Sequence, residues 1–473
     1  MRFRIGYALR HEGTIFRFLV ALLLLAPLPF GSNRPWSWSL LAFAIGILTI
    51  WWGLLLLHNS SMEFIPIGRI KWIVAPFMLT LAWSFTQAYL PIPAGWADPL
   101  WNQTAVALGG LVDPRLSLDP GATKTALMKL ASYGAVFFLS LQLCHSRRRS
   151  RRLLFWIAAG AVVYSLYGVT VFWTGSRTIL WYNLDDFAAP SADHVVATFI
   201  NHNHYATYAG LGLICLLAVM ADKIPQVLSA TGDSGRISSE ETSNFASLVV
   251  PGLLAFVILI SGLVLSHSRA GLVFTLLAVA VYLTMFVFIF HRAKSVRIGL
   301  VMAFLAITTM VYTVSGYAFE KRMEYLEESG EFRFALYEAT KEGIAHRPWS
   351  GIGHGAYNHA IKRYKNIELF HQLDTAHNVY LESAMELGIP ASFFLFVSIA
   401  AILLTCVRGM KKSHRGRPYS AAGLAALILV GFHSIFDFSM QIPAVAVTFA
   451  AIAGAACSRS FGSRQARASF RPV

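Results

Sequence analysis

Apolar runs of about 20 residues recur along the whole chain, and they constrain its fold more than any other feature. A helix of about 20 residues crosses the roughly 30 Å of hydrocarbon in a bilayer, where it satisfies its own backbone hydrogen bonds. Only 13% of the 473 residues are charged, against about 25% in soluble domains. The sequence therefore predicts an all-α polytopic membrane protein with about 12 transmembrane helices. The predicted spans are 15–31, 36–57, 70–90, 125–144, 153–173, 199–220, 247–265, 270–290, 297–315, 378–407, 419–437 and 440–457.

Lysine and arginine concentrate in alternate connections between these spans. Seven segments hold 25 of the 39 basic residues, and the positive-inside rule places such segments in the cytoplasm. Both termini are therefore predicted to be cytoplasmic. The net charge of +15 follows from this asymmetry and needs no nucleic-acid partner. The seven segments are 1–17, 58–71, 146–152, 222–246, 291–297, 408–418 and 458–473.

The same count places the longest polar interval, 316–377, outside the cytoplasmic membrane, between the ninth and tenth spans. Its first part is predicted to form an amphipathic helix that ends before Pro348, and a second short helix is expected at about 356–365. GIGHGAY between them supplies glycines for a tight turn. We expect residues 1–457 to form one membrane domain that includes this loop, and residues 458–473 to form a basic cytoplasmic tail.

Motifs for several common activities are missing from the sequence. It contains no P-loop, GxGxxG or HExxH pattern, so an ATP-driven pump or a zinc protease gains no support. The four cysteines lie in or beside apolar runs, and no disulfide is predicted. The motif FINHNHYA carries His202 and His204, but a spacing of two does not place both rings on one helix face, so no metal site is predicted. Its asparagines are better explained as helix caps.

Most histidines are predicted to lie on the outer side of the membrane. Ten of the 15 lie there, and polar residues at the ends of spans are the ordinary explanation. Arg269 is more informative, because a charge close to hydrocarbon is costly and is usually kept for a partner or a substrate. Interfacial snorkelling or a salt bridge to Asp437 would be a structural alternative. Asp437 is four residues after His433, so it could orient that ring or form a purely structural pair.

This combination of residues suits one kind of chemistry. The planar guanidinium of arginine binds two oxygens of a pyrophosphate at once, and it offsets the charge that develops as a pyrophosphate leaves. A nearby histidine can accept or orient the proton of an incoming hydroxyl. Glycosyl transfer from a lipid-linked pyrophosphate at the outer face would use these groups without a metal or another cofactor.

Four motifs in this order resemble the O-antigen ligase / O-antigen polymerase superfamily of bacterial membrane glycosyltransferases. They are FINHNHYA, SHSRAG, the run from FRFALYEA through RPWSGIGHGAY to AHNVYLESAMELG, and FHSIFDFSMQIP, and the resemblance covers about residues 120–457. It implies a GT-C-like helical fold with a large periplasmic loop. It also implies a glycan donor on undecaprenyl pyrophosphate and metal-independent transfer with inversion.

By this resemblance, Arg269 and Arg333 would hold the pyrophosphate, and His377 would activate or place the acceptor hydroxyl. Tyr337 departs from the family pattern, since tryptophan is expected four residues after the loop arginine. The candidates for a supporting role in substrate binding are Asn203, Asn378, Glu382, Glu386, His433 and Asp437.

The resemblance leaves the acceptor open, because ligase and polymerase differ only in whether lipid A core, protein or another lipid-linked chain receives the glycan. The expected location is the cytoplasmic (inner) membrane of a bacterium, in contact with membrane lipids. A transporter or flippase of lipid-linked sugars is the alternative from another class. No inverted repeat and no pair of broken spans with charge at mid-membrane supports it. An inactive assembly subunit would leave the outward histidines and arginines unexplained.

Overall fold

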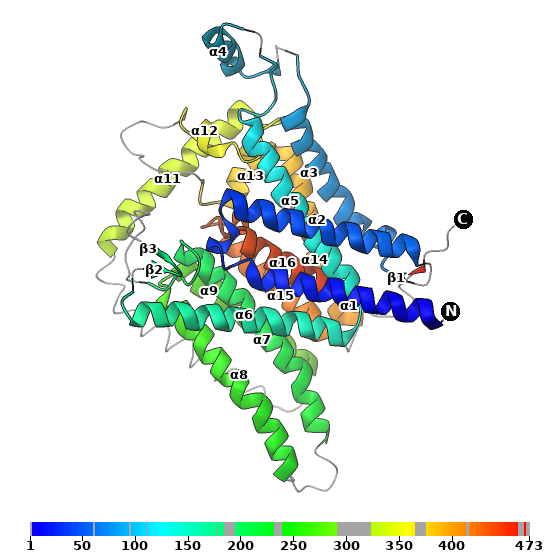
Figure 1. The fold of residues 1–473 in the computed structure, drawn as a ribbon. Coiled ribbons are helices and arrows are strands. Elements are labelled where there is room, and N and C mark those ends of the chain that lie inside the picture. The colour runs from blue at the N-terminus through cyan, green and yellow to red at the C-terminus, as the bar shows by residue number, and fades with distance from the viewer. Residues whose placement is uncertain are drawn as a thin grey trace.

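The chain folds as a bundle of long helices, with a further set of helices at one end (Figure 1). The computed structural model describes residues 2–59, 62–93, 96–110, 112–176, 178–183, 194–230, 239–290, 323–364, 375–412, 416–461 and 468–469. The long helices of the bundle are α1 (Arg2–Leu25), α2 (Pro35–His58), α3 (Lys71–Tyr89), α5 (Pro120–Leu143), α6 (Arg147–Trp173), α7 (His202–Ala230), α8 (Ser239–Leu265), α9 (Arg269–Phe290), α14 (Ile389–Lys412), α15 (Arg417–His433) and α16 (Pro443–Ser460).

The remaining elements lie outside this set of long bundle helices. They are α4 (Pro99–Leu108), α11 (Met323–His346), α12 (Tyr357–Ile361), α13 (Val379–Leu387), the short 3-10 helices η1 (Phe30–Ser32), η2 (Ile67–Arg69) and η6 (Ser439–Gln441), and the strands β1 (Glu63–Phe64), β2 (Thr178–Ile179), β3 (Tyr182–Asn183) and β4 (Ala468–Ser469). The antiparallel pairs β1–β4 and β2–β3 are the only sheets in the described residues.

Seven of the described helices are long and apolar enough to cross a membrane: α2, α5, α6, α7, α8, α14 and α16. Together with α9, which is a shorter apolar helix, they confirm a multi-pass, all-α membrane protein. Helices also occur at the other predicted spans, as α1, α3 and α15. The predicted span at 297–315 lies outside the described residues, so the total of twelve stays a prediction.

The predicted tenth span is wrong as a single helix. The structure breaks it at Gly388 into α13 and α14. Gly388 has φ of +77° and ψ of 161°, a conformation that is open essentially to glycine alone. A Cβ at this position would lie 2.5 Å from the carbonyl oxygen of Trp349 and 3.0 Å from the amide nitrogen of Gly351. The sequence LGIP indicates this helix break, because Pro390 suits the first turn of a new helix.

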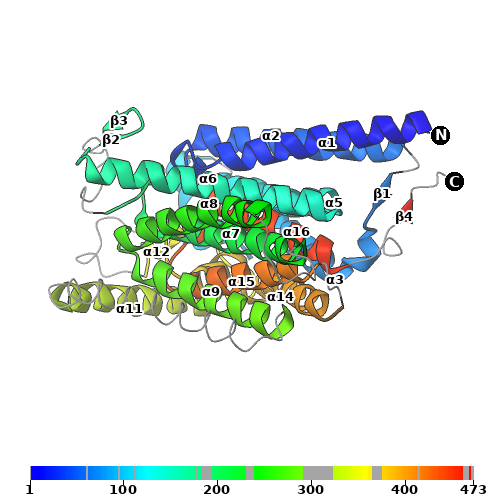
Figure 2. The ribbon, with the colours of Figure 1, turned by 90° about the horizontal axis from the view of Figure 1, so that it is seen from below.

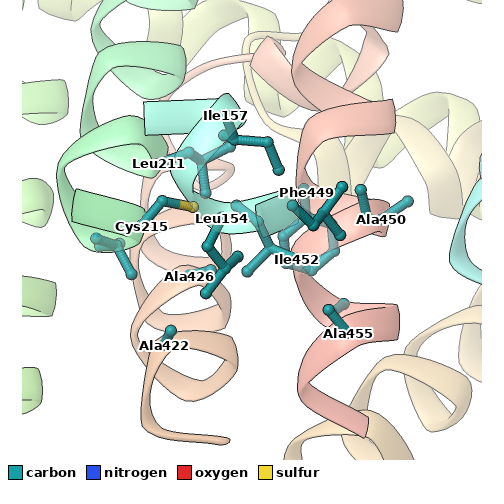
Figure 3. Close-up of a cluster of buried hydrophobic side chains, with 14 of the residues drawn as sticks. Leu154, Ile157, Leu211, Cys215, Ala422, Ala426, Phe449, Ala450, Ile452 and Ala455 are labelled. Atoms are coloured by element: carbon teal, nitrogen blue, oxygen red, sulfur yellow. The ribbon is translucent and has the colours of Figure 1, made fainter. Parts of the chain in front are cut away.

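Small residues allow the central helices to approach closely. Nearly all of α16 is buried, and a Cβ on its Gly454 would lie 2.3 Å from the carbonyl oxygen of Phe137 in α5. Such close contacts replace the hydrophobic driving force that lipid does not provide between spans. Figure 3 shows side chains from four helices meeting here: Leu154 and Ile157 of α6, Leu211 and Cys215 of α7, Ala422 and Ala426 of α15, and Phe449, Ala450, Ile452 and Ala455 of α16.

Ion pairs gather several of the predicted cytoplasmic segments at one end of the bundle. Arg149 contacts Glu12 at 2.7 Å, and Arg147 contacts the buried Asp222 at 2.6 Å. The pairing of β1 with β4 brings the 58–71 connection to the C-terminal tail. Both termini lie at this end, away from β2, β3 and α11 (Figures 1 and 2). This grouping agrees with the alternate basic loops, and the orientation in the membrane stays a prediction.

The long loop is helical where it is described, and it docks on the bundle. Helix α11 matches the predicted amphipathic helix, whereas α12 is shorter than expected. Asp98, the N-cap of α4, receives both guanidinium nitrogens of Arg363 at 2.9 Å and contacts Arg347 at 3.2 Å. The side-chain amide of Gln87 on α3 donates to the carbonyls of Ser350 and Glu386 at 2.8 and 2.9 Å. The first outside connection and α3 therefore both hold the loop.

The variant Gly388→Ala tests the docking of the loop, and Gly109→Ala is its matched control. Gly109, which ends α4, also has a positive φ of +63°, but nothing lies within 4 Å of a Cβ placed there. Alanine at either position incurs backbone strain of about 1–3 kcal/mol, and only at Gly388 does it also collide with the loop. We expect Gly388→Ala to lower the thermal unfolding midpoint in detergent clearly more than Gly109→Ala. Equal shifts would contradict the tight approach of the loop to Gly388.

Candidate functional site

Polar segments that are far apart in the sequence meet at the end of the bundle opposite the termini. We call this the site end and define it by Asn203, Ser268, His377 and Asp437. Asn203 lies in the first turn of α7, and Ser268 precedes α9. His377 precedes α13, and Asp437 follows α15. The four predicted motifs therefore converge, although each lies on a different element.

Asn203 connects three of these segments. Its own backbone amide donates to Asn201 Oδ1 at 2.8 Å, which fits the predicted capping role of the asparagines. Its side-chain oxygen accepts a hydrogen bond of 2.6 Å from Ser268 Oγ, and its side-chain nitrogen donates to Asp437 Oδ1 at 3.4 Å. The turn before α9 and the turn after α15 are thereby held against the start of α7.

Asp437 is the buried anion of the site, with 1% of its surface exposed. The hydroxyl of Ser439 donates to Oδ2, and His204 Nε2 lies 3.8 Å from the same oxygen. Burial alone would raise the pKa of Asp437. The imidazoles of His204 and His433 and the Ser439 hydroxyl outweigh burial and hold this pKa below its usual value. Asp437 is therefore ionised at neutral pH.

The predicted orientation of His433 by Asp437 is not what the structure shows. Helix α15 ends at His433, and although the Asp437 amide donates to the His433 carbonyl at 3.0 Å, no hydrogen bond joins the two side chains in the described residues. His433 Nδ1 instead lies 2.6 Å from Thr207 Oγ1, and Nε2 has no hydrogen-bond partner among the described residues. The ring in contact with the carboxylate is that of His204, at 3.8 Å, and His433 acts on Asp437 electrostatically. From the sequence, His204 is expected at most as a metal ligand. Its helical spacing of three from Thr207 places both side chains on one face of α7.

His377 sits in strained backbone at the entrance to α13. Its φ is +51°, a left-handed conformation that is uncommon for a residue with a side chain. Its ring meets Phe438 edge to face, with the centroids 5.0 Å apart, and His204 meets the same phenyl ring at 4.6 Å. Nδ1 of His377 is buried and has no hydrogen-bond partner in the described part of the chain.

The charges around His377 favour its neutral form. Burial is the largest cause of a lowered pKa, and the positive charge of Arg333 lowers the pKa further. The carboxylate of Asp437 acts in the opposite direction without cancelling these effects. The pKa of His377 is thus below its usual value, so at neutral pH the imidazole can accept a proton.

Helix α11 supports His377 through Tyr337. The phenol donates to the carbonyl of Ile435 at 3.3 Å and makes a longer contact of 3.5 Å with the carbonyl of His377. It thereby links the loop helix to both segments that carry the imidazole and the carboxylate. Arg333 lies four residues earlier on the same helix, and its charge also acts on Tyr337. Tyr337, the predicted departure from the family pattern, therefore supplies a hydroxyl donor at this position.

The two candidate arginines differ in what surrounds them. Arg333 is partly exposed and acts electrostatically on His377, so the structure brings these two together. Arg269 is exposed and begins α9, directly after the Ser268 turn that Asn203 holds. Both arginines are thus at the site end, and they belong to different elements.

Glu382, Glu386 and Asn378 bind backbone groups. Glu382 accepts the amide of Ala376 at 2.9 Å, and Glu386 accepts the amide of Tyr357 at 3.1 Å. Burial raises the pKa of both carboxyls. Asn378 caps α13 by accepting the amides two and three residues ahead, at 3.0 and 3.1 Å. These three side chains fix the path of the chain on both sides of His377.

No group of three or more His, Cys, Asp or Glu side chains that could hold a metal ion occurs in the residues that the structure describes. All four cysteines are buried thiols.

Comparison with known families points to the same region. The model of the O-antigen ligase family matches residues 254–396. The predicted resemblance to the O-antigen ligase superfamily is confirmed. The match covers less than half of the chain, and it includes Arg269, Arg333 and His377. No curated protein matches the chain. The family indicates a membrane enzyme of the ligase or polymerase type.

Asn378 provides a direct test of how the backbone near His377 is held. Asn378→Ala removes the acceptor for two amides of α13 and should cost about 1 kcal/mol, whereas Asn378→Ser keeps an oxygen that can cap. We expect a lower thermal unfolding midpoint for the alanine variant and a value near that of the parent chain for the serine variant. If alanine and serine behave alike, the cap does not stabilise this segment.

Proposed function

We propose that the protein is an O-antigen ligase-like glycosyltransferase with the GT-C-like fold that the family implies. It would transfer a glycan from undecaprenyl pyrophosphate to an acceptor hydroxyl at the periplasmic face of the bacterial inner membrane. The observation that carries this proposal is the setting of His377, a neutral imidazole near the cation of Arg333 and the carboxylate of Asp437.

In the proposed reaction, the acceptor oxygen attacks the anomeric carbon on the side opposite the pyrophosphate. The new carbon–oxygen bond forms as the bond to the pyrophosphate breaks, which inverts the configuration. His377 takes the hydroxyl proton, and the negative charge of Asp437 stabilises the imidazolium. Arg333 and Arg269 bind the pyrophosphate and offset the charge that it gains. Donor lipid, acceptor and these side chains account for every atom transferred, without a metal or cofactor.

The remaining candidates have supporting roles in this proposal. Asn203 holds the turn before Arg269 against α7 through Ser268, and Asp437 binds the Asn203 side chain, while Glu382 and Glu386 hold the loop. With both termini cytoplasmic, the site end faces the periplasm, where lipid-linked glycans are joined to their acceptors. The acceptor would be lipid A core, a protein, or a second lipid-linked chain, and the last of these would make the protein a polymerase.

The decisive experiment compares glycans from a host strain with and without the gene. A ligase predicts unattached glycan with intact lipid-linked chains in the deletion strain, and a polymerase predicts single-repeat glycan. Glycan that is unchanged in length and attachment would refute both.

His377→Ala should abolish complementation in that strain. Loss of a positioned base lowers the rate by about 10²–10⁴-fold, while the protein should still insert and accumulate. His346→Ala is the matched control, because this histidine is exposed on α11, where it contacts the carbonyl of Glu342 and the Tyr364 ring rather than the residues of the site end. We expect the control to retain transfer. Full activity of His377→Ala would remove His377 from the mechanism.

The pH dependence of kcat/KM should identify His377 as the base. Its lowered pKa places the acid limb below the value of about 6.5 of a free imidazole, since activity falls as pH drops through the pKa. Asp437→Asn removes a charge that raises this pKa and should move the limb to lower pH. Arg333→Gln removes a charge that lowers it and should move the limb to higher pH. Shifts in the same direction would contradict this assignment.

A further inference from the structure

The arginines in the first turns of α6 divide into two sets. Three of them face other helices and have carboxylate partners. Arg147 and Arg151 contact the buried Asp222 on α7 at 2.6 and 3.5 Å. Arg149 contacts Glu12 on α1 at 2.7 Å. These pairs account for the inward part of the sequence RRRSRR, at the end of the bundle that holds both termini.

The other two, Arg148 and Arg152, have no such partner. Both are exposed, and no ion pair or hydrogen bond joins either guanidinium group to another residue in the described part of the chain. They are four residues apart, so they lie on the same face of the helix, about 6 Å apart along its axis. Like charges with this spacing repel each other, and an anion beside both would offset the repulsion.

The face of α6 that carries these two arginines continues as an apolar stripe. Phe155 and Trp156 are one turn beyond Arg152 and are 47% and 45% exposed, and their rings meet edge to face with the centroids 5.4 Å apart. Val163 lies further along the same face and is 63% exposed. It is about 16 Å from Arg152 along the axis, which is about half of the hydrocarbon thickness of a bilayer. The exposed stripe therefore has the length of one leaflet.

The buried side of α6 fixes the direction of this stripe. Leu154, Ile157 and Ala161 are buried in the bundle, and with 3.6 residues per turn they lie on the opposite side of the helix. A solvated surface is the ordinary surrounding of an arginine run. Here, however, the same face passes directly from guanidinium groups to aromatic rings, which mark the headgroup level. Because α6 is one of the candidate spans, its two outward arginines lie at the depth of lipid phosphates.

We propose that Arg148 and Arg152 bind the phosphate of an anionic phospholipid whose acyl chains lie along Phe155, Trp156 and Val163. Each guanidinium group can donate to two phosphate oxygens at once. The lipid belongs to the leaflet at the end with the termini, which is the cytoplasmic leaflet in the predicted orientation, and it is distinct from the glycan donor at the site end. It would hold α6 at a fixed level in the membrane. The inference does not depend on glycan transfer.

Native mass spectrometry of the delipidated full-length chain in neutral detergent tests this site, with dioleoylphosphatidylglycerol as the probe. The double variant Arg148→Gln/Arg152→Gln should bind one lipid about 25-fold more weakly than the parent chain, because each arginine at the membrane surface contributes about fivefold. Parental affinity in this variant would overturn the proposal.

Arg408→Gln/Lys411→Gln is the matched control. It removes the same charge from exposed side chains of α14 at the same end of the bundle, where residues 400–407 include no aromatic ring. We expect the control to keep the parental affinity. Equal weakening by the two double variants would overturn the defined site in favour of general attraction to a basic surface. Without lipid, the α6 variant should unfold at the parental temperature, and a lower midpoint would overturn the proposal by showing that these arginines bind protein.

Two further probes test the chemistry of the ligand. Dioleoylphosphatidylcholine, which carries no net charge, should bind the parent chain and the α6 variant alike. A preference of the parent chain for this lipid as large as for dioleoylphosphatidylglycerol would overturn the role of charge. Inorganic phosphate at the same concentration should not displace dioleoylphosphatidylglycerol, because it lacks the acyl chains. Displacement would overturn the lipid assignment in favour of a free anion.

Discussion

The buried carboxylate of Asp437 is the interaction on which the rest of the site depends. An isolated charge in such a position costs several kcal/mol, and here Asn203, His204 and Ser439 surround it. Because these partners come from the start of α7 and from the turn after α15, satisfying the charge requires both segments to be in place. Ser268 then bonds to Asn203, which adds the turn before α9. One desolvated anion thereby sets the relative positions of three helix ends.

The long loop is attached to this framework mainly through its backbone. Side chains of Gln87 and Glu386 bind carbonyls and amides around the GIGHGAY turn, and glycines let those backbones approach. Buried backbone groups need such partners, so the loop has few alternative ways to dock. Tyr337 and Glu382 extend the same attachment to the segment that holds His377. The loop therefore forms one side of the site, and the helices of the bundle form the rest of it.

The sequence predicted much of this arrangement because its strongest signals are local. The length of an apolar run defines a membrane helix, and the alternation of basic loops defines which connections share a side. The ion pairs of Arg147 and Arg149 at the end with the termini agree with that alternation. Run length did not predict the helix break that lies inside one apolar run. Gly388 lies within the apolar run predicted at 378–407, and only the close approach of the loop showed that its conformation ends α13.

Sequence alone determined that this chain is a multi-pass helical membrane protein that resembles the O-antigen ligase superfamily, because run length, charge asymmetry and short motifs can be recognised without coordinates. Tertiary structure decided which side chains face one another. His204 rather than His433 makes the side-chain contact with Asp437, and Glu382 and Glu386 bind the backbone of the loop. These pairings join residues as far as 234 positions apart, as between Asn203 and Asp437. No local pattern encodes such contacts, since they arise from how the helices pack and where each one ends.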